Sequence, residues 1–166
     1  MIHPMIVHFP IALLLISALF DLLGVVLRKP PFHLVGFWTL LIGGIGLLVS
    51  LASGEEASGP AIVLGMGTLV QQHKLFATLS VLLFGLLALA RLIVAWRSRQ
   101  WPAITSNGDV LLGWARSHRS ILLVYFVVTV AAVACLGITG YLGGELAYSH
   151  NPVNPAITPV PPEIGE

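Results

Sequence analysis

Four histidines are the residues of this 166-residue chain whose type and spacing could do chemistry. His3 and His8 stand close together in the opening stretch HPMIVHFP, and His73 and His150 stand beside the ends of other apolar runs. Imidazole without a cysteine partner suits haem iron, copper, zinc or proton transfer. The chain has one cysteine, Cys135, so a disulfide within the chain is excluded. The histidines are therefore the first candidates for a cofactor site.

The composition places these histidines in a membrane protein. Hydrophobic residues make up 57% of the chain and charged residues only 9%. A soluble domain carries about 25% charged residues. Four stretches have the roughly 20 mostly apolar residues that a membrane-crossing helix needs: residues 5–27, 34–53, 74–96 and 120–147. The sequence therefore predicts an all-α membrane protein, a bundle of four transmembrane helices over residues 1–150 with a proline-rich, extended tail over 151–166.

The basic residues orient this bundle in the membrane. Arginine and lysine gather in loops on the inner side of a membrane. The loop after the first helix and the loop after the third helix are both basic, whereas only Lys74 stands at the opposite end. We therefore expect both termini to lie outside, in the periplasm, with the chain in a bacterial inner membrane. The basic loop residues are Arg28, Lys29, Arg97, Arg99, Arg116 and Arg119.

With this topology every helix brings an imidazole or a carboxylate to the outer end of the bundle. Glu55 and Glu56 follow the second helix, and His73 opens the third. Glu145 lies a little over one turn before His150 at the end of the fourth. Ionisable groups at membrane depth are costly and usually mark function. We expect a site in this layer, the alternative being that each histidine only meets lipid headgroups.

Two charged residues fall deeper in the bundle. Asp21 of the first helix and Arg91 of the third are expected at depths within about two helical turns of each other, at a rise of about 1.5 Å per residue. We predict a structural ion pair between them. His33 and His118 lie on the inner side beside loop residues. We assign these two histidines to headgroup contact.

Haem b is the cofactor that the histidine pattern favours. In an up-down-up-down bundle the first and third helices are diagonal, so His8 and His73 can face each other, and His3 and His150 can form a second pair. Two imidazoles close the iron to substrate, which favours electron transfer over catalysis. We therefore predict an electron carrier with one or two haems near the outer face, a subunit of a larger redox complex rather than a stand-alone enzyme. Glycines that could admit a porphyrin, or simply pack helices closely, are Gly43, Gly44, Gly46, Gly137, Gly140, Gly143 and Gly144.

Two other interpretations stay open. The same histidines could bind copper, zinc or iron without haem, with Glu55, Glu56 or Glu145 as oxygen ligands. Alternatively, the protein is a structural subunit without a cofactor, whose outer polar layer makes hydrogen bonds between subunits. No H-E-x-x-H, C-x-x-C or C-x-x-C-H motif is present, which excludes zincin chemistry and attached c-type haem.

The expected partners follow from composition and from these interpretations. The lipid bilayer covers the apolar helices. Other redox subunits, such as a cytochrome c or an iron–sulfur protein, or a second copy of the chain, would complete an electron-transfer assembly. A net charge of +1, without basic clusters among aromatic residues, gives no support for nucleic acid.

The opening stretch HPMIVHFPIALL resembles that of a family of small four-helix bacterial membrane proteins catalogued as domain of unknown function two-two-three-one. The resemblance covers nearly the whole chain. It implies the same four-helix fold and, since such proteins sometimes occur beside or fused to iron–sulfur electron carriers, a redox role by analogy. Asn151 and the proline-rich tail replace the glycine that often follows the last histidine. The matching positions are His3, Pro4, Val7, His8, Phe9, Pro10, Asp21, the stretch ASGEEA, His73, Gly143, Gly144, Leu146, Tyr148 and His150.

Overall fold

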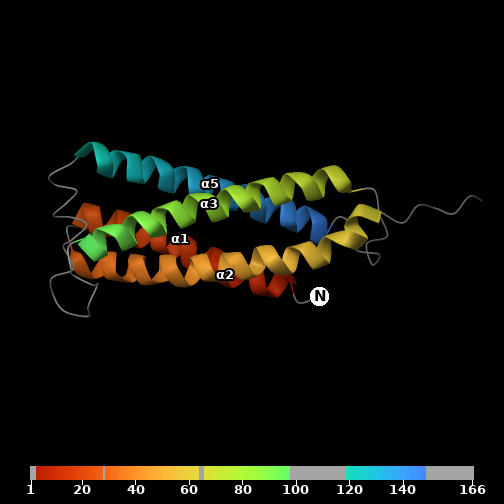
Figure 1. The fold of residues 1–166 in the computed structure, drawn as a ribbon, viewed down its shortest axis with the longest axis horizontal. Helices are drawn as coiled ribbons and strands as arrows, with labels where there is room; N and C mark the ends of the chain where they lie inside the picture. The colour runs from red at the N-terminus through yellow and green to blue at the C-terminus, as the bar shows by residue number, and fades with distance from the viewer. Residues whose placement is uncertain (1–2, 28, 64–65, 98–118, 149–166) are drawn as a thin grey trace, which may run out of the picture.

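Four long helices make up the part of the chain that the structure describes (Figure 1). The computed structural model describes residues 3–27, 29–63, 66–97 and 119–148. Each helix is long and apolar enough to cross a membrane, and the described ranges contain no strand. The predicted all-α, four-helix membrane fold is thus confirmed, while the tail over 151–166 lies outside the described residues. The helices are α1 (His3–Leu27), α2 (Pro30–Val63), α3 (Gly67–Arg97) and α5 (Arg119–Tyr148).

The helices run up and down in turn, so consecutive helices are antiparallel (Figure 1). α1 packs mainly against α2, and α3 mainly against α5. Contacts between α2 and α3 join the two pairs, α1 and α5 make a smaller contact, and the diagonal pairs touch least. We call the end where α1 and α3 begin the histidine end, since His8 and His73 lie there. The opposite end, with Lys29, Arg97 and Arg119, is the basic end.

The centre of the bundle is a small apolar core, while many large apolar side chains point outward. Leu19, Leu82 and Val130 are examples, each more than half exposed. Helices that are apolar on every face are typical of membrane spans, because lipid covers the outer side. The core residues are Leu14, Leu40, Leu47, Phe84, Leu87, Ala132 and Leu136.

Close packing between α1 and α2 explains several glycines of α2. A Cβ at Gly46 would lie 2.9 Å from the Cβ of Pro10, and a Cβ at Gly43 would lie 2.9 Å from the Cγ of Leu14. Pro10 is inside α1 and is buried. A proline within a helix removes one backbone hydrogen bond, and here its ring packs where α2 has no side chain. These glycines thus serve helix packing.

Two helices are longer than the apolar runs predicted. α2 continues to Val63, whereas the predicted span ended at residue 53, and α3 begins at Gly67 rather than at residue 74. Apolarity marks the part of a helix that meets lipid, but a helix continues into a polar region wherever its residues favour it. The stretch ASGEEA is rich in alanine and glutamate, which are strong helix formers. The chain after the second predicted span is therefore helical as far as Val63.

Candidate functional site

One imidazole at the histidine end is held in a defined orientation. The Nδ1 atom of His73 lies 3.1 Å from the backbone carbonyl oxygen of Thr139 in α5. A carbonyl only accepts hydrogen bonds, so Nδ1 is the donor, and in the neutral imidazole the ring lone pair is then on Nε2. A Cβ at Gly143, one turn further along α5, would lie 3.1 Å from Cε1 of His73. The glycine therefore gives the half-buried ring room to pack against α5.

The other residues predicted for this end are placed less completely. The side chains of His8 and Glu145 are exposed. His3, Glu55 and Glu56 lie on the helical backbone at this end, but their side chains are outside the described part, as is all of His150. Within the described part, no three side chains of His, Cys, Asp or Glu are grouped to hold a metal ion.

The glycines of α5 fall into two kinds. Gly143 contacts His73, whereas a Cβ at Gly137, Gly140 or Gly144 would meet no atom within 4 Å. The latter three lie beside open space, where lipid or a partner can approach. Of the glycines considered for a close macrocycle contact on this helix, Gly143 is thus the one beside a histidine.

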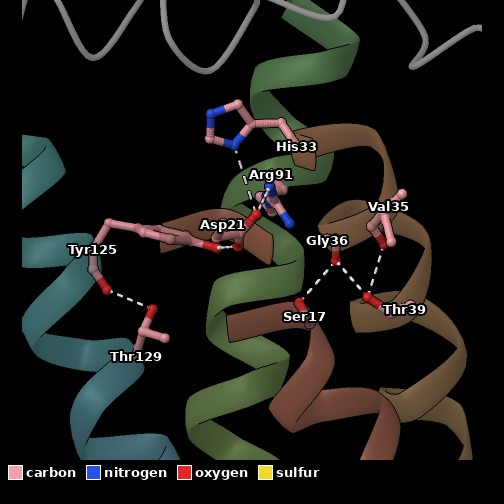
Figure 2. Close-up of polar contacts among 9 residues, drawn as sticks. All are labelled: Ser17, Asp21, His33, Val35, Gly36, Thr39, Arg91, Tyr125 and Thr129. Carbon is pink, nitrogen blue, oxygen red and sulfur yellow. Dashed lines mark hydrogen bonds and ion pairs between the residues drawn. The ribbon is translucent and has the colours of Figure 1, made fainter. Parts of the chain in front are cut away.

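A second polar cluster lies near the basic end and joins three helices (Figure 2). Nη2 of Arg91 in α3 lies 2.5 Å from Oδ1 of Asp21 in α1. The hydroxyl of Tyr125 in α5 donates to Oδ2 of Asp21 over 2.7 Å. Asp21 and Arg91 are only 2% and 3% exposed. The ion pair expected from the sequence is present, and it crosses the bundle between diagonal helices.

His33 of α2 completes this cluster, which we call the Asp21 cluster: Asp21, His33, Arg91 and Tyr125. The His33 side chain is 4% exposed, and its Nδ1 lies 3.7 Å from Oδ1 of Asp21 (Figure 2). That distance is within ion-pair range but is too long for a hydrogen bond. The assignment of His33 to headgroup contact is therefore wrong, because the ring is buried among the helices. His118 lies outside the described residues.

Glycines on two helices make room for the Asp21 cluster. A Cβ at Gly24 would lie 2.6 Å from Nε2 of His33, and a Cβ at Gly36 would overlap Oδ1 of Asp21. Each glycine stands three residues after an ionisable residue of its own helix, on the same helix face. This reciprocal spacing is the sequence signal that could have placed His33 beside Asp21.

Further contacts fix the position of the cluster. Ser17 Oγ donates to the carbonyl oxygen of Gly36 over 2.7 Å, which ties α1 to α2 (Figure 2). The guanidinium carbon of Arg91 lies 5.9 Å from the ring centroids of both Phe37 and Tyr125. Aromatic rings attract a cation placed over their faces. The guanidinium is thus held by a carboxylate at one edge and by aromatic neighbours.

The fold and these polar groups define a multi-pass membrane protein with ionisable residues inside a four-helix bundle. The chain belongs to the family described as "Predicted membrane protein (DUF2231)", whose model matches residues 1–154. Neither the curated proteins nor the solved structures compared with it gave a match.

Proposed function

We propose that the protein is an electron carrier of the bacterial inner membrane that holds b-type haem at the histidine end. His73 would supply one imidazole ligand, and His3, His8 or His150 would supply the other. Both termini face the periplasm, which places the haem near the outer face of the membrane. The observation that carries this proposal is the hydrogen bond between His73 and the carbonyl of Thr139.

That hydrogen bond suits a metal ligand. A histidine that binds a metal almost always donates its other ring N–H to a carbonyl, a carboxylate or water, which fixes the tautomer and the ring orientation. In His73 the proton is on Nδ1, so Nε2 is the atom that would bind iron. Gly143 lets the ring lie against α5 without a steric clash. The hydrogen bond therefore orients the His73 ring before any cofactor binds.

The second imidazole is the less defined part of the proposal. His8 lies near the beginning of α1, the helix diagonal to α3. The His8–His73 pair and the His3–His150 pair stay predictions. When bound, haem would supply one-electron chemistry, and the chain itself would hold the ring of His73. Outside the membrane a cytochrome c or an iron–sulfur protein would exchange electrons with it.

Optical spectroscopy of the purified full chain tests this function. We expect a reduced-minus-oxidised spectrum with the α-band of b-type haem, and we expect His8→Ala and His73→Ala each to abolish it. His33→Gln, at the basic end, is the matched control and should keep the band. If haem survives both substitutions, the His8–His73 pairing is wrong.

The same preparation distinguishes the two alternatives. A colourless protein with stoichiometric copper, zinc or iron would support a metal site of histidine and glutamate ligands. A colourless protein without metal would support the interpretation as a structural subunit without a cofactor. Either result would overturn the haem proposal.

A further inference from the structure

The Asp21 cluster leaves several buried nitrogen atoms without hydrogen bonds. Nε and Nη1 of Arg91, and both ring nitrogens of His33, have no hydrogen-bond partner among the residues that the structure describes. A buried donor without an acceptor costs about 1–3 kcal/mol, and more when it is charged. The polar groups in protein interiors nearly always have a partner, often an ordered water molecule. These nitrogens therefore point to a small ligand that carries oxygen.

The charge balance of the cluster favours water over an anion. Asp21 from α1 carries one negative charge and Arg91 from α3 carries one positive charge, while α2 contributes His33 and α5 contributes the hydroxyl of Tyr125. With a neutral imidazole at His33, the charges of Asp21 and Arg91 cancel, and an anion would add an uncompensated negative charge to a buried site, which is costly. Water is neutral and both donates and accepts. It can thus accept from Arg91 and pair with either nitrogen of His33.

The cluster lies nearer to the basic end of the bundle than to the histidine end. His33 lies three residues after Pro30, the first residue of α2, so it is about 5 Å along the axis from that helix end at about 1.5 Å per residue. In the other direction, Leu87 lies one turn along α3 from Arg91 and belongs to the apolar core. The core therefore separates the cluster from the histidine end.

We propose that water from the basic end hydrogen-bonds to the His33 ring and to the Arg91 guanidinium. The Asp21 carboxylate then lies in a polar site that is hydrated from that side. Ionisable residues inside membrane bundles commonly face such water-filled sites. This site is separate from the proposed haem site, and it needs no cofactor.

Water-edited solid-state NMR of the isotope-labelled full chain in lipid bilayers tests the proposal. Magnetisation from water should reach the His33 ring nitrogens and Nε of Arg91 at least about three times faster than it reaches the backbone amide of Leu136 in the core, as expected for buried water in contact with both. The ring-nitrogen signals of His33 are assigned as those that are absent from the spectrum of His33→Gln. Transfer as slow as at Leu136 would overturn the proposal.

Two His33 variants and the replacement of the buffer anion extend this test. His33→Gln keeps a donor and an acceptor, so fast transfer to Arg91 should persist, whereas His33→Phe removes both and should slow it about threefold or more. Unchanged transfer in His33→Phe would contradict water bridging the two residues. If His33→Phe does not fold, the rates of magnetisation transfer to His33, Arg91 and Leu136 in the wild-type chain still test the proposal. A changed Arg91 Nε chemical shift when nitrate replaces chloride would show an anion instead, and would also overturn the proposal.

Discussion

Replacing Asp21 with asparagine removes one charge from the interior and changes little else. The amide keeps an oxygen for the hydroxyl of Tyr125, but Arg91 becomes a buried cation without its partner. Removing one member of a buried ion pair typically costs about 3–5 kcal/mol. Because the Nη2–Oδ1 distance is 2.5 Å and both side chains are almost fully buried, we expect Asp21→Asn to fall within that range. Arg91→Met, which leaves the carboxylate alone, should destabilise the bundle by a similar amount.

The double variant Asp21→Asn with Arg91→Met separates the contribution of the ion pair to the free energy of unfolding from that of the lost side-chain volume. It contains no uncompensated charge, so its cost should be smaller than the sum of the two single costs by about 3 kcal/mol, the coupling expected for groups in direct contact. The assay is the free energy of unfolding, from reversible SDS titration in mixed micelles followed by circular dichroism. Ser80→Ala is the control, because Ser80 is buried but its hydroxyl bonds to a carbonyl of its own helix.

Additive costs in this cycle would refute the reasoning. If each single variant lost less than about 1 kcal/mol, the pair would behave like an exposed surface pair, and the buried network would not hold the diagonal helices together. A Ser80→Ala variant as unstable as Asp21→Asn would show that the assay reports general disruption.

Three further predictions concern single contacts. Tyr125→Phe removes a hydrogen bond to a carboxylate and should lower the free energy of unfolding by about 1.5–3 kcal/mol in the same titration; no loss would contradict that bond. Gly24→Ala places a methyl group against the buried His33 ring and should lower the free energy of unfolding by about 1–3 kcal/mol. Gly44→Ala, which meets open space, should be neutral or stabilising. Equal effects of the two variants would contradict the packing described. Gly143→Leu should displace the imidazole of α3 and abolish haem binding in the optical spectrum, whereas Gly140→Leu should leave the band; a band that survives Gly143→Leu would contradict the placement of the site.

The fold was largely predictable because lipid imposes simple rules on sequence. Four apolar runs with few charges have no alternative but to span as helices, since only internal hydrogen bonds can satisfy the backbone in lipid. The extensions of α2 and α3 were not predictable in the same way. Apolarity does not mark helix beyond the lipid, where the residues from Gly54 to Val63 depend on helix propensity and local contacts.

The polar clusters were predictable only in part. Asp21 and Arg91 stood out because isolated charges inside apolar runs need a partner. Their similar depths in the bundle were enough to predict that they form an ion pair. His33 was missed because it stands near a predicted loop, where a histidine more often meets headgroups. Its burial depends on the rotation of α2 and on Gly24 of the facing helix, which are properties of packing. The hydrogen bond of His73 to a backbone carbonyl of α5 likewise depends on helix register, which spacing along one helix cannot give.

The reduced-minus-oxidised optical spectrum of the purified protein, compared between wild type and His73→Ala, decides whether the histidine end binds haem. Electron transfer through haem at the histidine end predicts a b-type α-band in the wild type that disappears in His73→Ala and remains in His33→Gln. The absence of the band from the wild type, or its persistence in His73→Ala, would contradict the account.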